Sequence, residues 1–302
     1  MQPVIVWFRD DLRLSDHPAL QEAASRGAPV IGLYVRDEQS RALKPPAARP
    51  LGGATRWWLA HSLRALGKSF EAIGGTLVLR TGPAASVIAT LARETNAGAV
   101  FWNDIAQAPH QAIAGDVESA LASDGVVSKI FPGDLLVDPQ AIRNKDNRGL
   151  RVFTPFWRRV QGLGDPPKPL PAPKKLTSVS GIASEALDEW KLEPTQPDWA
   201  GGLRESWTPG EAGAQARLKA FLDDGIEGYA NDRDRPDHDG TSRLSPHLRF
   251  GEISPRQLWH AARFVAAEHP RLAGDIDKFL SELGWREFCR HLLFDVDRKS
   301  VV

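Results

Sequence analysis

The run Val4-Ile-Val-Trp-Phe-Arg-Asp-Asp-Leu-Arg-Leu-Ser-Asp-His-Pro-Ala-Leu20 carries the clearest structural signal in the chain. Its first five residues are uninterrupted and apolar, which is typical of a strand buried on both faces of a parallel sheet. Arg9, Asp10, Asp11 and Arg13 follow at once, so interleaved charges stand at the carboxyl end of this strand. On chemistry alone they form either a ligand site or a loop whose ion pairs fix the turn.

Four more apolar runs bounded by turn residues follow within about the first 130 residues. They cover Val30–Val35, Thr76–Leu79, Ala99–Trp102 and Ser128–Phe131. Helical spacing separates them, most clearly over Thr55–Ile73. The alternation predicts a Rossmann-like α/β domain over residues 1–131, with a parallel sheet covered by helices on both faces. Ligands of such sheets lie beyond the carboxyl ends of the strands, here the loops after Phe8, Val35 and Trp102.

The rest of the chain predicts a different architecture. Residues 132–206, which include the proline-rich Asp165–Pro173, read as a long connector. Residues 207–302 read as all-α, with helices over Ala212–Leu222 and Ile276–Leu293. Ser254, Pro255 and Gln257 form a capping box with proline in the first turn, which predicts a helix start.

Composition and missing motifs exclude several classes of protein. The chain has 302 residues, no G-x-G-x-x-G after its first strand and no P-loop motif, which argues against NAD-dependent enzymes and P-loop NTPases. Cys289 is the only cysteine, so intramolecular disulfides and cysteine-rich metal sites are excluded, and we expect no metal. Without a signal peptide or a membrane-spanning run, we expect a cytoplasmic protein that does not bind a membrane.

A basic run stands out because the formal net charge is zero. Any contact with nucleic acid would need a local patch of positive charge. The plainest candidate comprises Arg143, Lys145, Arg148, Arg151, Arg158 and Arg159. These residues form either a patch that binds nucleic acid or a basic face that is only solvated.

The most informative stretch is Gly228–Pro255, which contains Thr-Ser-Arg-Leu-Ser at residues 241–245. Hydroxyl groups and a guanidinium at the entrance to a helix are suited to an anion. The same residues also suit an ordinary helix cap with a surface arginine. In Phe279–Leu293, helical spacing places Glu282, Trp285, Arg286 and Cys289 on one face. This face either lines a pocket or carries an exposed Glu–Arg salt bridge over a core tryptophan.

Four segments in this order and spacing resemble the DNA photolyase and cryptochrome family, in particular bacterial cyclobutane-pyrimidine-dimer photolyases. They are Val4–Leu20, Val152–Trp157, Gly228–Pro255 and Phe279–Leu293. The resemblance implies a carbon–carbon lyase that uses light and FAD to repair pyrimidine dimers in DNA. For Phe153, Phe156 and Trp157 we expect packing roles and no catalytic role.

The resemblance also implies roles for single residues. Glu282 and Trp285 would be catalytic and contact the damaged dinucleotide, and Arg233 would meet the DNA backbone. Phe279 departs from a tryptophan that many members place near the flavin. FAD would be bound by Tyr229, Thr241, Ser242, Arg243, Leu244, Ser245 and Arg286.

Many members also carry an antenna chromophore, a folate or a deazaflavin, in the α/β domain. The loop Asn103-Asp-Ile-Ala-Gln-Ala-Pro109 departs from the Asn-Arg-x-Tyr-x-Pro pattern expected there. We therefore expect no antenna bound in the usual way, and the residues do not identify one.

The resemblance implies further helices beyond Phe294-Asp-Val296, whereas the last six residues depart from the family. We expect a truncated, monomeric chain, produced by an early stop, a shifted reading frame or fragmentation. Its incomplete helical domain would expose the apolar face of Ile276–Leu293 and bind FAD poorly. Two alternatives stay open: a cryptochrome-type blue-light receptor, and a non-catalytic remnant that binds only a nucleotide or a protein.

Overall fold

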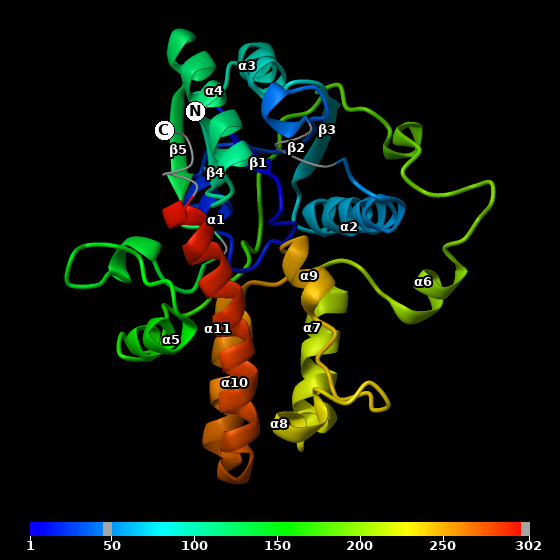
Figure 1. The fold of residues 1–302 in the computed structure, drawn as a ribbon. Coiled ribbons are helices and arrows are strands. Elements are labelled where there is room, and N and C mark those ends of the chain that lie inside the picture. Colours follow the sequence, from blue (N-terminus) through cyan, green and yellow to red (C-terminus); the bar gives the residue numbers. More distant parts are fainter. Residues whose placement is uncertain (45–49, 134, 297–302) are drawn as a thin grey trace.

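The five predicted strands form one parallel sheet in the order β3-β2-β1-β4-β5 (Figure 1). The structure is a computed structural model that describes residues 1–44, 50–133 and 135–296. The strands are β1 (Val4–Phe8), β2 (Val30–Arg36), β3 (Thr76–Thr81), β4 (Ala99–Asn103) and β5 (Val127–Phe131). The chain runs from β1 outward to β3, then returns to β4 on the other side of β1, so the predicted Rossmann-like fold is confirmed.

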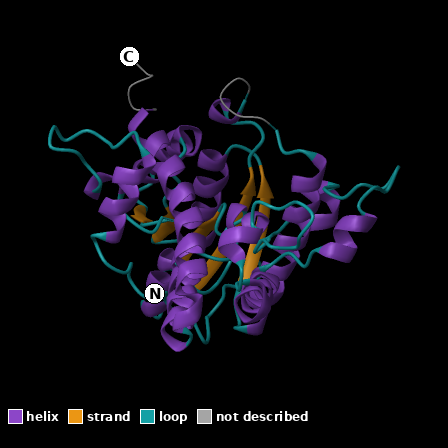
Figure 2. Ribbon diagram, turned by 60° about the horizontal axis from the view of Figure 1, so that its bottom comes forward, coloured by secondary structure: helices purple, strands orange, loops and turns teal. Residues whose placement is uncertain are grey.

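Helices cover both faces of the sheet, as the alternation in the sequence predicted (Figure 2). Val4, Val6 and Phe8 of β1 point into a core shared with two helices, α1 (Pro18–Ser25) and α2 (Gly53–Ala72). Ile5 and Trp7 point into the opposite core, which is shared with α3 (Ala84–Thr95) and α4 (Ala108–Ser123). A 3-10 turn, η1 (Arg41–Leu43), follows β2. Strand β1 is therefore buried on both faces, which explains why it carries no polar residue.

The connector, residues 132–206, contains little regular structure. Its elements are η2 (Pro139–Ala141), α5 (Phe153–Gln161), η3 (Leu187–Trp190) and α6 (Gly201–Ser206). Leu176, Trp190 and Ala200 are buried in the core of the α/β part, so the connector is packed against that part over much of its length. Phe156 and Val160 of α5 instead form a small core with Ile142 and Phe288.

The last third of the chain is helical, as predicted. It contains α7 (Glu211–Ala220), a π-helical turn (Phe221–Gly225), α8 (Tyr229–Asp232), α9 (Ser245–Arg249), α10 (Pro255–Glu268), the 3-10 turn η5 (Pro270–Leu272) and α11 (Ala273–Val296). The capping box is confirmed, because the Ser254 hydroxyl accepts from Gln257 N–H while the Gln257 side chain accepts from Ser254 N–H. Figure 1 shows α10 and α11 side by side, with α7 to α9 across a gap from them.

The expectation that α11 exposes its apolar face was wrong for most of the helix. Ile276, Phe279, Leu280 and Leu283 are buried with α7, α8 and α10, and Phe288 is buried with α5. Leu293 is 41% exposed and the last six residues, 297–302, lie outside the described part of the chain. In the residues that the structure describes, no helix is long and apolar enough to cross a membrane.

Candidate cofactor and DNA site

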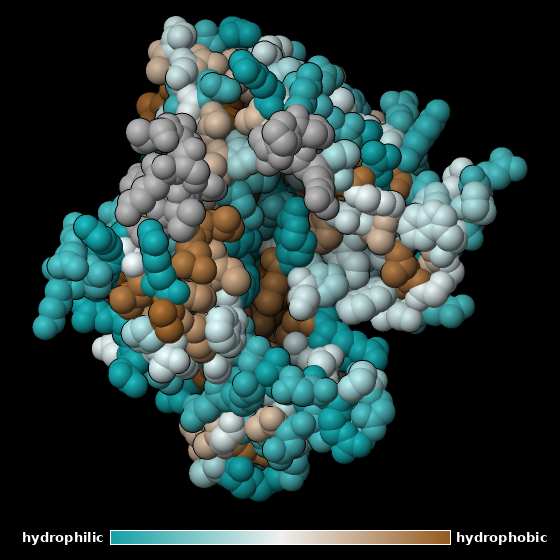
Figure 3. All heavy atoms as spheres, viewed as in Figure 1, coloured by the Kyte–Doolittle hydropathy of each residue, from teal (hydrophilic) through white to brown (hydrophobic). Residues whose placement is uncertain are grey.

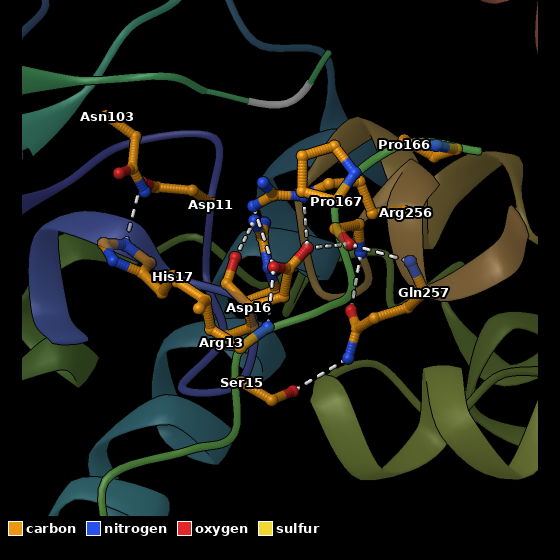
Figure 4. A network of polar contacts seen from close by, with 12 residues as sticks. Asp11, Arg13, Ser15, Asp16, His17, Asn103, Pro166, Pro167, Arg256 and Gln257 are labelled. Atoms are coloured by element: carbon orange, nitrogen blue, oxygen red, sulfur yellow. Dashed lines mark hydrogen bonds and ion pairs between the residues drawn. The ribbon is translucent and has the colours of Figure 1, made fainter. Parts of the chain in front are cut away.

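The charged loop after β1 ties three parts of the molecule together (Figure 4). Asp16 is fully buried and accepts from the Arg256 guanidinium, with Oδ1 2.8 Å from Nη2 and Oδ2 3.0 Å from Nε. Its carboxylate also accepts from Ser254 Oγ and from the backbone N–H of Leu170 in the connector. Arg13, 1% exposed, donates to the carbonyl groups of Asp16 and Gly251. The loop thus joins α10, the connector and the sheet.

Asp11 in the same loop is buried and fully engaged. Its carboxylate lies 2.9 Å from His17 Nε2 and accepts from the N–H of Arg9 at 2.7 Å and from Asn103 Nδ2 at 2.8 Å. Burial alone would raise the pKa of Asp11, but the nearby His17 and these hydrogen bonds outweigh it and hold that pKa well below its usual range. Of the two interpretations of this loop, the structure therefore favours ion pairs that fix a turn.

In the helical part, a cavity of about 600 Å³ lies between the 241–245 loop, α8 and α11. Figure 3 shows a hollow between α11 and α9 with hydrophobic atoms at its base. Every residue that the sequence assigned to FAD lines this cavity, and Arg233 and Glu282 line it as well. Of the predicted site residues, Trp285 is the exception. The remaining lining residues are Leu248, Arg249, Leu258, Phe279, Leu283 and Arg290.

The loop 241–245 presents polar groups to the cavity because α7 holds it from behind. Arg217 Nε donates to the carbonyl of Ser242 at 2.9 Å, and the same guanidinium reaches the carbonyl of Thr241. Arg243 adopts a left-handed backbone with φ of 53°, which turns the chain into α9. Among the described residues, the hydroxyl groups of Thr241 and Ser245 have no hydrogen-bond partner, so they are available to a ligand.

The cavity wall carries an excess of positive charge. Its cations are Arg233, Arg243, Arg249, Arg286 and Arg290, whereas Glu282 is the one carboxylate among the described lining residues. Several of these guanidinium groups are held in place by acids outside the wall: Arg243 by Asp239 at 2.8 Å and Arg286 by the buried Glu287 at 2.8 Å. Fixed cations around a partly apolar cavity are suited to an anionic ligand such as a diphosphate.

The cavity wall also includes apolar and aromatic residues. Tyr229 meets Phe221 and Phe279 edge to face, with ring centroids 5.4 and 5.8 Å apart. Burial raises the pKa of the Tyr229 hydroxyl, so it stays protonated at neutral pH and can donate a hydrogen bond. Leu258 and Leu283 also line the cavity.

Glu282 sits at the edge of the cavity between two cations. Its Oε1 atom lies 2.8 Å from Arg233 Nη1 and 3.1 Å from Lys278 Nζ. The two residues that the resemblance assigned to DNA and to the dimer therefore pair with each other in this structure. An anion that draws Arg233 away would leave Glu282 Oε1 paired with Lys278 alone.

Trp285 lies off the cavity, against α5. Its ring is 43% exposed and stacks on Phe153 with centroids 3.7 Å apart and planes 8° apart. The prediction that Trp285 shares the face of Glu282 and Arg286 was wrong in detail, because successive residues turn by about 100° around a helix. Arg286 points to the cavity, so its neighbour Trp285 points toward α5. Phe153, assigned to packing alone, supports this exposed ring.

The residues beneath α9 were not predicted from the sequence. Glu252 is fully buried and accepts from Trp58 Nε1 at 3.0 Å, from Gly210 N–H at 2.6 Å and from Ser62. Its other oxygen lies 2.5 Å from Nδ1 of His247 on α9. These contacts join residues almost two hundred positions apart, so no local pattern could have revealed them. They fix α9, which follows the 241–245 loop, on the α/β part.

A second cavity, of about 470 Å³, lies beyond the carboxyl ends of β1 and β2, where ligands of such sheets were expected. Asp10, Tyr34 and Arg36 contribute to it, and Arg249 lines both cavities. Arg249 Nη1 lies 2.6 Å from Asp10 Oδ2. From the region after β4, His110 lines this cavity, whereas residues 103–109 are not among its described lining residues.

Comparisons with known proteins match this arrangement. The family model for DNA photolyase matches residues 4–174. The chain is 45% identical to the deoxyribodipyrimidine photo-lyase of Agrobacterium fabrum over 97% of this chain and 59% of that protein. It is also 33% identical to cryptochrome-1 of Arabidopsis thaliana, over 96% of this chain and 43% of that one.

A solved structure agrees in fold. The bacterial class III photolyase from Agrobacterium tumefaciens matches with a TM-score of 0.90 and 44% identity, covering 97% of this chain and 59% of that one. The chain thus spans about three fifths of the length of this photolyase. Sheet order, helical part and family model agree, and the chain belongs to the DNA photolyase family.

Proposed function

We propose that this chain provides the FAD phosphate site and part of the lesion site of a light-driven photolyase that repairs cyclobutane pyrimidine dimers in DNA. The observation that carries the proposal is the cavity between the 241–245 loop and α11. It gathers the residues that the family resemblance assigned to FAD from segments more than forty positions apart. The similarity to named photolyases supports the same function.

The residues present fit FAD. Two phosphate groups need cations and hydrogen-bond donors, which Arg243, Arg286, Thr241 and Ser245 offer in the cavity wall. Flat rings need apolar walls, which Phe279 and the leucines of α10 and α11 offer. A volume of about 600 Å³ lies within the usual range of cofactor sites.

When bound, reduced FAD supplies the light-excited electron that splits the dimer. The side chains of this protein would position FAD and the damaged DNA. Arg233 would bind a DNA phosphate, and Glu282 would hydrogen-bond to the extruded dinucleotide. Trp285, which offers an exposed ring backed by Phe153, would stack on a base.

The test is an absorption spectrum of the 302-residue chain after reconstitution with FAD, followed by repair of a dimer-containing oligonucleotide in blue light. We expect flavin bands that remain after gel filtration, and loss of dimers only in the light. Flavin uptake and DNA binding without repair would favour the cryptochrome alternative. A folded chain that takes up no flavin would leave only the binding-module alternative. A further band outside the flavin spectrum would indicate an antenna chromophore, for which the second cavity is the candidate site.

A further inference from the structure

The connector carries a group of cations that the cavity does not use. Five of the six residues in the basic run are exposed, and in the described part of the chain none of the five pairs with a carboxylate. The sixth, Arg143, lies over the ring of Phe294. We call the five the connector cations: Lys145, Arg148, Arg151, Arg158 and Arg159.

Arginines elsewhere on the surface are mostly paired. Arg64 lies 2.7 Å from Asp188, and Arg204 lies 2.9 Å from Asp198. The whole chain has a formal net charge of zero, so five cations without acidic partners concentrate positive potential on one side. Within residues 143–161 the only acid is Asp146. A solvated face that served solubility alone would interleave both signs, as the paired arginines do.

The first two cations are held by an ordered turn. Asn144 Oδ1 accepts from the N–H groups of Asp146 at 3.0 Å and Arg148 at 2.8 Å. An antiparallel bridge joins Arg143 to Gly149 and closes the turn. Lys145 and Arg148 therefore project from a fixed backbone, which lowers the entropy cost of binding a partner.

Arg158 and Arg159 project from the outer face of α5, which is anchored by its inner face. Phe156 is 1% and Val160 2% exposed, and the Phe156 ring lies 5.2 Å from that of Phe288 on α11. The helix has nine residues and is about 13 Å long. That length matches roughly four base pairs of duplex DNA measured along its axis.

This surface begins beside the cavity. Phe153 in the first turn of α5 stacks on Trp285, and the next residue, Arg286, lines the cavity. Figure 1 shows α5 and the preceding loop on the side of α11 that faces away from α9. In Figure 3, hydrophilic side chains project from that side next to a hydrophobic area over α5 and α11.

We propose that the connector cations bind the phosphate backbone of DNA beside the extruded dimer, without reading its sequence. The proposal rests on the proposed repair function, which requires DNA at the cavity, and it adds a contact surface outside the helical part. A DNA strand that crosses Trp285 would reach α5 next, and the connector cations would neutralise its phosphates.

The test measures binding of the full FAD-reconstituted chain to fluorescent duplexes with and without one pyrimidine dimer, over a series of salt concentrations. The variant is Arg158→Gln with Arg159→Gln. The matched control is Lys174→Gln with Lys175→Gln, two exposed lysines that directly precede Leu176, a connector residue buried against the α/β part. Circular dichroism checks that both variants are folded.

We expect the arginine variant to bind both duplexes about 5- to 20-fold more weakly at low salt, and the slope of log K against log salt to fall by about one per lost phosphate contact. The lysine control should match the wild type. A slope and affinity equal to wild type in the arginine variant would overturn the proposal, even if the wild type prefers damaged DNA. An altered slope without any preference for the dimer would support the surface and contradict the repair function. Loss of binding to anionic lipid vesicles with unchanged DNA binding would assign the surface to a membrane and also overturn the proposal.

Discussion

Two charged segments of this chain share residue types but differ in their surroundings. The loop at residues 9–17 and the segment 239–249, which enters α9, both contain arginine, aspartate, leucine, serine and histidine. In the first loop Asp11, Arg13 and Asp16 are buried and satisfied by other parts of the chain. In the second, Thr241, Arg243 and Ser245 line a cavity. Among the described residues, the hydroxyl groups of Thr241 and Ser245 have no hydrogen-bond partner.

Because one charged segment is buried and the other lines a cavity, charge in a loop does not by itself indicate a ligand site. A buried ion pair contributes when both partners are present and is costly to break, whereas an exposed one contributes little to stability. The first loop should therefore control folding and the second should control binding. Four predictions separate these roles.

The largest effect is expected for Asp16→Asn. The change removes the buried charge that the largely covered Arg256 guanidinium faces, while asparagine still tolerates the positive φ of 50°. Breaking a buried pair costs about 3 kcal/mol, so the unfolding temperature should fall by roughly 5 to 10 °C. Asp239→Asn is the matched control in the second loop, where the partner of Arg243 is exposed, and thermal denaturation should show almost no change.

The second prediction concerns acid. The pKa of Asp11 is lowered in the folded chain, so its contribution to stability is complete above the unfolded value of 3.8 and is lost as the pH falls below it. Thermal denaturation of the wild type should show a steep loss of stability below about pH 4. Asp11→Asn should be less stable at neutral pH and should lose less on acidification. An unchanged pH profile would show that Asp11 is not held as an ion.

The third prediction concerns binding. Arg243→Gln removes a cation from the wall of the cavity, and a charge-assisted hydrogen bond to phosphate contributes about 1.5 to 3 kcal/mol. The affinity for FAD should fall roughly 10- to 100-fold, with the unfolding temperature unchanged. Arg235→Gln serves as control, because Arg235 pairs with Asp237 in the same segment and does not line the cavity. Equal losses in both variants would place the phosphates elsewhere.

The smallest effect is expected at the junction of α5 and α11. Phe153→Leu removes the ring that stacks on Trp285, and an aromatic pair contributes about 0.5 to 1.5 kcal/mol. The preference for dimer-containing over undamaged DNA should fall roughly two- to tenfold. Phe153→Tyr, which keeps the ring, should restore it. If leucine and tyrosine behave alike, Phe153 serves only to pack α5.

Much of the fold could be predicted because it follows from local patterns. Uninterrupted apolar runs predicted all five strands, and Ser254 with Gln257 predicted the start of α10. Helix α5 was not predicted, because it is short and packs against Phe288, which lies over 130 positions away in the sequence. The burial of α11 was also missed, since the partners that cover Leu283 and Phe288 come from α5, α8 and α10.

The residues of the site could be predicted, but the contacts between them could not. The family resemblance gathered Tyr229, the 241–245 loop and Arg286, and the structure places them around one cavity. The resemblance could not give the pairing of Arg233 with Glu282 or the contact of Trp285 with Phe153, because both depend on rotation about helix axes. The role of Glu252 was not predicted, since all but one of its partners described above, His247, come from α2 and the start of α7.

The central claim is that the cavity beside the 241–245 loop holds the phosphates of FAD. Titration of the folded 302-residue chain with FAD, followed by flavin fluorescence and repeated with ADP as competitor, tests it most directly. We expect saturable binding of one FAD per chain, displacement by ADP, and a roughly 10- to 100-fold lower affinity for FAD in Arg243→Gln. Saturable binding that ADP does not displace, or no binding by a folded chain, would contradict it.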